Sequence, residues 1–157
     1  MSTPLFQVDA FTRRVLHGNP AAVCVLEQWP SDSVLQRIAQ ENNLSETAFL
    51  VHEGPRMRIR WFTPTVEVDL CGHATLASAW VYFHRLDRAA QQVIFDSKSG
   101  PLQVWRDADE LRMRLPNRAP VPCEGVPRVV EGLRSMPTQL LASSAYLAVF
   151  EHESQVR

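Results

Sequence analysis

Short apolar segments separated by turn residues make up most of the chain. Segments rich in Val, Ile, Phe and Trp and bounded by Gly, Pro, Asn, Asp or Ser are typical of β-strands. This pattern predicts strands at 5–11, 21–26, 47–52, 57–62, 66–70, 93–97, 101–106 and 111–115, and turns at 17–20, 53–55, 99–100 and 107–110.

An amphipathic helix is predicted to begin at Ser31 and to end near Asn42 and Asn43. Ser31 or Asp32 is placed to cap its first turn. Its apolar face consists of residues that recur at helical spacing, namely Val34, Leu35, Ile38 and Ala39.

A second predicted helix, from Ala74 to Phe83, contains no charged residue. Small side chains occupy its early turns, and aromatic side chains fill its later part. A helix that is apolar on every side is normally buried on every side. With so many strands around it, this helix predicts an α+β fold in which a curved sheet wraps around a central buried helix.

The junction Cys71-Gly72-His73 carries the most informative chemistry of the sequence. It follows a strand-like segment and precedes small and apolar residues at a helix start. Gly72 would let the backbone turn tightly, and free N–H groups and the positive end of the helix dipole would face the same space. A thiol, an imidazole and N–H donors at one place are suited to holding the carboxylate of a small acid during proton transfer. A junction of this kind is also common as a purely structural feature.

Two further segments contain candidate polar residues. Glu46 stands where the first helix ends and an apolar strand begins, a position at which carboxylates are usually just solvated. Asn19 belongs to a turn that leads into a strand, where its amide either points inward or shapes the turn.

Composition is that of a globular domain of 157 residues with 45% hydrophobic residues and a net charge of −1. This charge gives no reason to expect nucleic acid or an anionic membrane as a partner, and no apolar run approaches the length of a membrane span. The start of the sequence lacks a secretory leader pattern. The three cysteines, Cys24, Cys71 and Cys123, form no CxxC pair, so we expect reduced thiols in a cytoplasmic protein.

Five ordered segments resemble the PhzF-like family, which is named for an isomerase of phenazine biosynthesis and has the diaminopimelate-epimerase fold. The matching segments are Phe6-Gln7-Val8-Asp9-Ala10-Phe11, Gly18-Asn19-Pro20-Ala21-Ala22-Val23, Leu44-Ser45-Glu46-Thr47-Ala48-Phe49, Arg60-Trp61-Phe62-Thr63-Pro64 and Asp69-Leu70-Cys71-Gly72-His73-Ala74-Thr75-Leu76. These segments lie between residues 6 and 76, and the resemblance as a whole extends over nearly the whole chain.

The resemblance implies a cofactor-independent isomerase or epimerase that moves a proton on a small carboxylate-containing metabolite, without a metal. Glu46 would be the acid–base residue and His73 would hold a substrate oxygen or position the proton. Gly72 and Ala74 would offer backbone N–H groups to the substrate, and Asn19 would be a further substrate contact.

Cys71 has two alternative roles under this resemblance. In the related epimerases a cysteine at this turn transfers protons together with a second cysteine from the other half, and a helix N-terminus would lower the pKa of such a thiol. In the phenazine isomerase a glutamate does this work, which would leave Cys71 as a small packing residue.

Family members have two similar halves with the active site in the cleft between them, and this chain resembles the N-terminal half. We expect that half at 1–115, a Pro-rich connector at 116–143 and the beginning of a second half at 144–157. The alternative function is a catalytically incomplete half that acts as a binding or dimerisation module. The expected partners are a C-terminal half or a second copy, which would place two copies of Glu46 and His73 around one cleft.

Other site types have less support in the sequence. A metal site on Cys71 and His73 lacks further ligands at suitable spacing. A Cys-His hydrolase would need the two side chains of one turn to face each other. A phosphate loop would need more than one glycine near this turn.

Overall fold

The computed structural model describes residues 3–14, 16–54, 56–124 and 126–156. Pro55, in the expected turn at 53–55, therefore lies outside the described residues. The chain divides into two compact units, and the boundary falls between Pro116 and Asn117. Each unit is described by itself.

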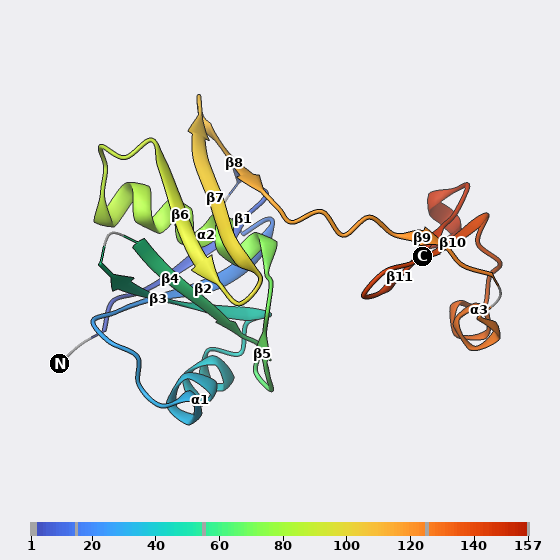
Figure 1. Ribbon diagram of the computed structural model, residues 1–157, viewed down its shortest axis with the longest axis horizontal. Coiled ribbons are helices and arrows are strands. Elements are labelled where there is room, and N and C mark those ends of the chain that lie inside the picture. Colours follow the sequence, from blue (N-terminus) through green and yellow to red (C-terminus); the bar gives the residue numbers. More distant parts are fainter. Residues whose placement is uncertain (1–2, 15, 55, 125, 157) are drawn as a thin grey trace. The chain divides into compact units, whose positions relative to one another are not determined.

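The first unit is built on a mixed, curved sheet (Figure 1). Its strands follow the order β1-β2-β3-β4-β6-β7-β8, with β5 paired to β4. The pairs β2–β3 and β4–β6 are parallel, and the others are antiparallel. The strands are β1 (Leu5–Ala10), β2 (Asn19–Leu26), β3 (Glu46–Glu53), β4 (Arg56–Phe62), β5 (Glu67–Val68), β6 (Gln92–Ser97), β7 (Gly100–Asp107) and β8 (Glu110–Arg114). Every strand expected for this unit is present, although the segment 66–70 contains only the short β5.

The central helix α2 (Gly72–Val81) continues into a π-helical turn, η1 (Tyr82–Leu86), and packs against β1, β2, β3 and β8. The expected burial of this helix on every side is only partly correct. Trp80 is 37% exposed, and Leu76 is half-buried. This stripe of α2 faces the space between β1 and β8, the two strands at the ends of the sheet, where no described strand covers it.

Two hydrophobic clusters lie on opposite faces of the sheet. Val23 belongs to the cluster around α2, whereas its neighbour Cys24 belongs to the cluster around helix α1 (Asp32–Asn42). Successive side chains of a strand point to opposite faces, which explains this division. Helix α1 begins after Ser31, as expected, although the Ser31 side chain makes no capping hydrogen bond. The helix ends before Asn43, which has a left-handed conformation. Its apolar face packs through Leu35 and Ala39.

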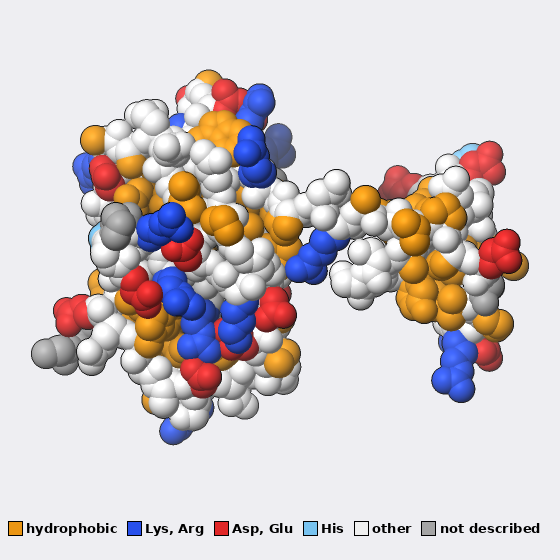
Figure 2. Space-filling view, viewed as in Figure 1, with side chains coloured by type: hydrophobic (Ala, Val, Ile, Leu, Met, Phe, Trp, Pro, Cys, Tyr) orange, Lys and Arg blue, Asp and Glu red, His pale blue; other side chains and the backbone are white. Residues whose placement is uncertain are grey.

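The arginines of β4 form a polar face in which each guanidinium has an acidic partner. Arg56 lies 3.1 Å from Asp96, and Arg58 lies 3.7 Å from Glu53. Figure 2 shows basic and acidic side chains intermingled over this part of the first unit. This face is therefore the solvated, ion-paired surface that is usual for such a charge pattern, rather than a basic binding stripe.

The second unit has strands β9 (Val121–Pro122), β10 (Gln139–Ala142) and β11 (Tyr146–Val149) in the order β11-β10-β9. It also contains helix α3 (Pro127–Leu133) and a short 3-10 turn, η2 (Glu153–Gln155). β9, α3 and β10 fall inside the segment expected to be a connector, so this segment holds more regular structure than its proline content indicated. The assignment of 144–157 to a second half stays a prediction.

Within the described part of the chain, no helix is both long enough and apolar enough to cross a lipid bilayer.

Candidate active site

The candidate site forms where β2, β3 and α2 begin. β2 and β3 are parallel with Ala21 opposite Glu46, so the starts of both strands lie at the same edge of the sheet. Gly18 precedes β2 with φ +101°, and a Cβ there would lie 2.3 Å from the carbonyl oxygen of Ala10. Only glycine fits this turn without strain, and the turn leads directly into Asn19 at the start of β2.

The junction before α2 differs from the expected tight glycine turn. Cys71 is the N-cap residue in extended conformation, and Gly72 is the first helical residue. Gly72 does not have a positive φ, and a Cβ there would meet only the Met113 side chain, at 3.8 Å. The turn thus does not require a glycine, and the missing side chain instead leaves space open at the helix start.

The imidazole of His73 is the centre of the site and has a neighbour at each ring nitrogen. The Cys71 Sγ lies 3.4 Å from Nδ1. On the other edge of the ring, Glu46 Oε2 lies 3.4 Å from Nε2 and Ser45 Oγ lies 3.3 Å from it. The side chain of His73 is 9% exposed and that of Glu46 is 19% exposed. The structure therefore brings Glu46, Cys71 and His73 together, and a small solute can still reach the carboxylate.

Ser45 connects Asn19 to this group and was not singled out in the sequence. Its hydroxyl oxygen lies 3.4 Å from both Asn19 Oδ1 and the carbonyl oxygen of Pro20 and can donate its one proton to either of them. Ser45 stands next to Glu46 in the sequence, but side-chain alternation along a strand would have placed the two on opposite faces. Because Ser45 precedes the first residue of β3, that alternation does not apply, and both side chains reach His73.

The Cys71 thiol is protonated at neutral pH. Burial raises its pKa to about 11. The N–H groups of Ala74 and His73 lower this pKa, whereas the negative charge of Glu46 and a hydrogen bond between the thiol and the Glu46 carboxylate raise it further. The shift is opposite in sign to the one expected from a helix start alone, because the loss of solvation exceeds the effect of these N–H groups. The backbone N–H of Ala74 forms a hydrogen bond with the Cys71 sulfur. The N–H of Gly72, at the start of the helix, has no partner within the helix.

Glu46, Cys71 and His73 also offer one ligand atom each within 4.8 Å of one another, the only such group among the described residues. The chemistry of the set suits Zn²⁺. In this geometry, however, the thiol is at Nδ1 and the carboxylate is at Nε2. A metal ion binds one nitrogen of an imidazole, so an ion held by all three residues would require at least one side chain to rotate.

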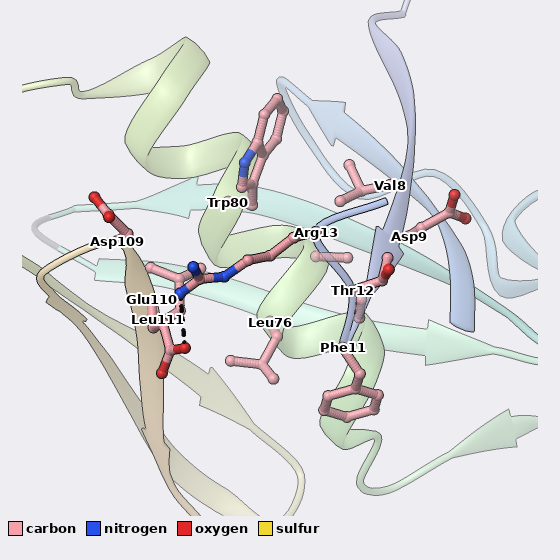
Figure 3. Close-up of a pocket in the computed structure, with 12 residues that line it drawn as sticks. Val8, Asp9, Phe11, Thr12, Arg13, Leu76, Trp80, Asp109, Glu110 and Leu111 are labelled. Carbon is pink, nitrogen blue, oxygen red and sulfur yellow. Dashed lines mark hydrogen bonds and ion pairs between the residues drawn. The ribbon is translucent and has the colours of Figure 1, made fainter. Parts of the chain in front are cut away.

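A separate groove of about 470 Å³ lies between the end of β1 and the start of β8 (Figure 3). Leu76 and Trp80 of α2 line it, and an ion pair of 2.9 Å between Arg13 and Glu110 spans it. Neither Glu46 nor His73 lines this groove, so it is distinct from the group around the imidazole.

Comparison with known proteins identifies relatives of this chain. An "uncharacterized isomerase" of Pseudomonas aeruginosa is 49% identical over 156 residues, which are 99% of this chain and 60% of that protein. A human "phenazine biosynthesis-like domain-containing protein" is 46% identical over 124 residues, covering 74% of this chain and 43% of that protein. The chain thus spans about 60% of the length of the bacterial relative.

Solved structures show the same fold. A PhzF-family phenazine biosynthesis protein from Enterococcus faecalis superposes with a TM-score of 0.87 and 43% identity, over 99% of this chain and 60% of that one. A predicted epimerase from Pseudomonas aeruginosa, at 21% identity over 94% of this chain and 58% of that one, shares the fold with a TM-score of 0.75. The expected α+β, diaminopimelate-epimerase-like fold is confirmed. The family model described as "phenazine biosynthesis-like protein" matches residues 8–139, so the chain belongs to the PhzC-PhzF family.

Proposed function

We propose that this chain supplies one side of an isomerase site that moves a proton on a small carboxylate-containing metabolite. Glu46 is the residue that accepts and returns the proton, and His73 donates a hydrogen bond to a substrate oxygen. The observation that carries the proposal is the 3.4 Å approach of Glu46 Oε2 to His73 Nε2 at the start of α2.

The arrangement supports this chemistry in two ways. A carboxylate that is partly shielded from water and accessible from one side can exchange a proton with a carbon acid. The imidazole lies beside it. The helix-start N–H of Gly72, the neighbour of His73 in the chain, is a further donor for the negative charge that develops on the substrate after deprotonation. The relatives described as isomerases are consistent with this class of reaction.

Because the relatives are longer, we further propose that full activity needs a second half that closes over Glu46. Exclusion of water strengthens the electrostatic interactions within a site and prevents proton leakage. The chain by itself leaves 19% of the Glu46 side chain exposed, and its activity should be correspondingly lower than that of a two-half protein.

Solvent deuterium incorporation tests the proposal. Small amino acids and hydroxy acids are incubated with the protein in D₂O, and mass spectrometry measures the deuterium gained at carbon. We expect Glu46→Gln to remove the incorporation, whereas Glu41→Gln, at an exposed site on α1, leaves it unchanged. The assay is run on the chain alone and on a version extended to the length of its relatives. If the Glu46→Gln variant incorporated as much deuterium as the wild type, both in the chain alone and in the extended version, the acid–base role of Glu46 would be refuted.

A second candidate function, a binding or dimerisation module, is favoured by the groove of Figure 3. β1 pairs only with β2 and β8 only with β7 among the described strands, and apolar side chains of α2 are accessible between them. Unpaired strand edges and exposed apolar groups favour association with another chain. Native mass spectrometry distinguishes the candidates, since a stable dimer without deuterium-exchange activity would support the module.

A further inference from the structure

We infer that Cys71 is a positioning residue, which together with Ser45 holds His73 in the tautomer that carries its proton on Nε2. This inference deepens the proposed function, because it fixes the direction in which the imidazole donates. It assigns Cys71 a role that is neither proton transfer to the substrate nor simple packing.

The first argument comes from the Nδ1 side of the ring. Cys71 Sγ is 3.4 Å from Nδ1, and both residues are more than nine-tenths buried. A thiol with a pKa of about 11 keeps its proton at neutral pH, and this proton has two acceptors within reach, Nδ1 and the Glu46 carboxylate, of which the inference assigns it to Nδ1. An Nδ1 that accepts this hydrogen bond carries no proton of its own, and the proton of the neutral ring is then on Nε2.

Ser45 contacts the ring on its Nε2 side. Ser45 Oγ is 3.3 Å from Nε2. Its single proton has the carbonyl oxygen of Pro20 and Asn19 Oδ1 within reach, each at 3.4 Å, and a bare Nε2 would be a third acceptor. The Pro20 oxygen can only accept, so the first of these bonds does not depend on the orientation of the Asn19 amide. When the Ser45 proton is held there, the Ser45 oxygen faces Nε2 as an acceptor, and this arrangement agrees with a proton on Nε2, the nitrogen that also faces the Glu46 carboxylate.

These contacts form a chain of donors that runs in one direction, from Cys71 through His73 to Ser45. The same Nε2 proton faces Glu46 Oε2 at 3.4 Å. In the proposed reaction, Glu46 begins as the base and His73 is already a donor when a substrate oxygen approaches.

NMR measures the tautomer directly on the chain as it exists, without any substrate. The chain is labelled with ¹⁵N-histidine, and long-range ¹H–¹⁵N correlation spectra are recorded at about pH 8, above the ordinary pKa of imidazole. The His73 signals are assigned by their loss in His73→Gln. We expect one neutral tautomer with a protonated Nε2 and a bare Nδ1.

Variants separate positioning from packing. Cys71→Ala should lower the ratio of the Nε2–H to the Nδ1–H form by about two- to fivefold, as expected for the loss of one weak hydrogen bond. Cys71→Ser, which keeps a donor, should restore the wild-type ratio. Cys24→Ala is the matched control, because Cys24 is equally buried but packs in the cluster around α1, and it should leave the His73 signals unchanged.

Two outcomes would overturn the inference. One is a protonated Nδ1 in the wild-type chain, which would mean that the thiol donates to Glu46 instead. The other is a ratio that is unchanged in Cys71→Ala while amide spectra show an intact fold. Neither outcome depends on catalysis, so the inference and the proposed function fail or hold separately.

Discussion

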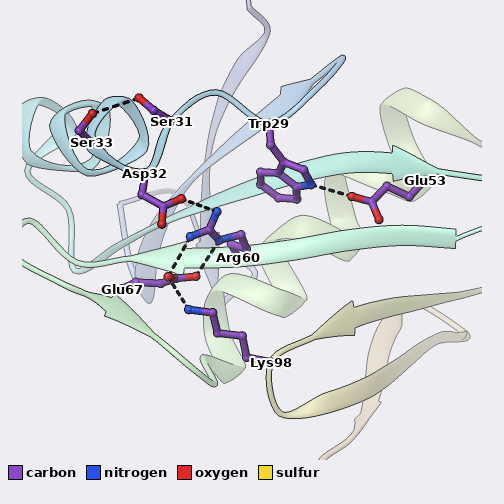
Figure 4. Close-up of polar contacts among 8 residues, drawn as sticks. All are labelled: Trp29, Ser31, Asp32, Ser33, Glu53, Arg60, Glu67 and Lys98. Carbon is purple, nitrogen blue, oxygen red and sulfur yellow. Dashed lines mark hydrogen bonds and ion pairs between the residues drawn. The ribbon is translucent and has the colours of Figure 1, made fainter.

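The Arg60 ion-pair cluster, drawn in Figure 4, gives the sharpest stability prediction for this chain. Arg60 donates to both carboxylate oxygens of Glu67, at 2.7 and 2.9 Å, and to Asp32 at 2.9 Å. Lys98 donates to the same Glu67 carboxylate. The cluster connects β4, β5 and α1. Its Glu67 stands four residues before Cys71, so the cluster anchors the segment that leads to the candidate site.

The expected cost of Arg60→Met follows from the burial of the pair. The side chains of Arg60 and Glu67 are only 17% and 16% exposed, so solvent screens them weakly. A hydrogen bond to a charged group contributes about 1.5–3 kcal/mol, and removal of one partner leaves a carboxylate short of donors. Lys98 still compensates Glu67 in the variant. We therefore expect the free energy of unfolding to fall by about 2–3 kcal/mol.

Urea unfolding followed by circular dichroism at about pH 7 measures this loss. Arg58→Met is the matched control on the same strand, because Arg58 is 51% exposed and lies 3.7 Å from its partner Glu53. A loss below about 0.5 kcal/mol is expected for this exposed pair. If Arg60→Met cost no more than Arg58→Met, the reasoning from burial and bidentate geometry would be refuted.

The same cluster predicts a dependence on pH with a definite sign. Hydrogen bonds from Arg60 hold the pKa of Glu67 below its ordinary value of 4.5, although burial opposes the shift. A depressed pKa in the folded state stabilises the fold above the unfolded pKa, and this contribution is lost as the pH falls through the folded value. The stability difference between wild type and Glu67→Gln should therefore be complete at neutral pH and should shrink below about pH 4.5. A difference that grew on acidification would contradict this assignment.

Two further predictions concern the turns and thiols of the candidate site. Gly18→Ala should destabilise the chain by about 2–4 kcal/mol, because the residue has a positive φ and its Cβ would collide with backbone. Gly72→Ala should change stability by less than about 0.5 kcal/mol, because its Cβ would make only an ordinary contact of 3.8 Å with the Met113 side chain. Urea unfolding compares the two variants, and similar losses would contradict the role assigned to Gly18. Alkylation by iodoacetamide at about pH 8 is mapped by peptide mass spectrometry. It should be at least about tenfold slower at Cys71 than at the half-buried Cys123, because burial raises the pKa of Cys71. Faster alkylation at Cys71 would show that its thiol is activated.

The sequence predicted the strands of the first unit because their apolar runs are short and bounded by turn residues. It also predicted α1 with both ends, since Ser31 and Asn43 have the properties of helix termini. It overestimated the burial of α2, because composition alone does not reveal that Leu76 and Trp80 face a space without a covering strand. The second unit was harder to predict, because its elements are short and several prolines fall among them.

For the site, the motifs indicated Glu46, His73 and Cys71, and the structure places these three residues in contact. The sequence missed Ser45, whose side chain reaches His73 only because β3 begins one residue later. The sign of the pKa shift of Cys71 was also beyond sequence reasoning. It depends on how far burial outweighs the helix-start N–H groups, and burial is a property of the folded chain.

The most direct test of the proposed function is the effect of Glu46→Gln on solvent deuterium incorporation, measured in the version of the protein that is extended to the length of its relatives. The account predicts that incorporation into at least one small amino or hydroxy acid is lost in Glu46→Gln and is retained in Glu41→Gln. Retention of the wild-type rate in Glu46→Gln would show that another group takes the proton, and the acid–base role of Glu46 would have to be abandoned.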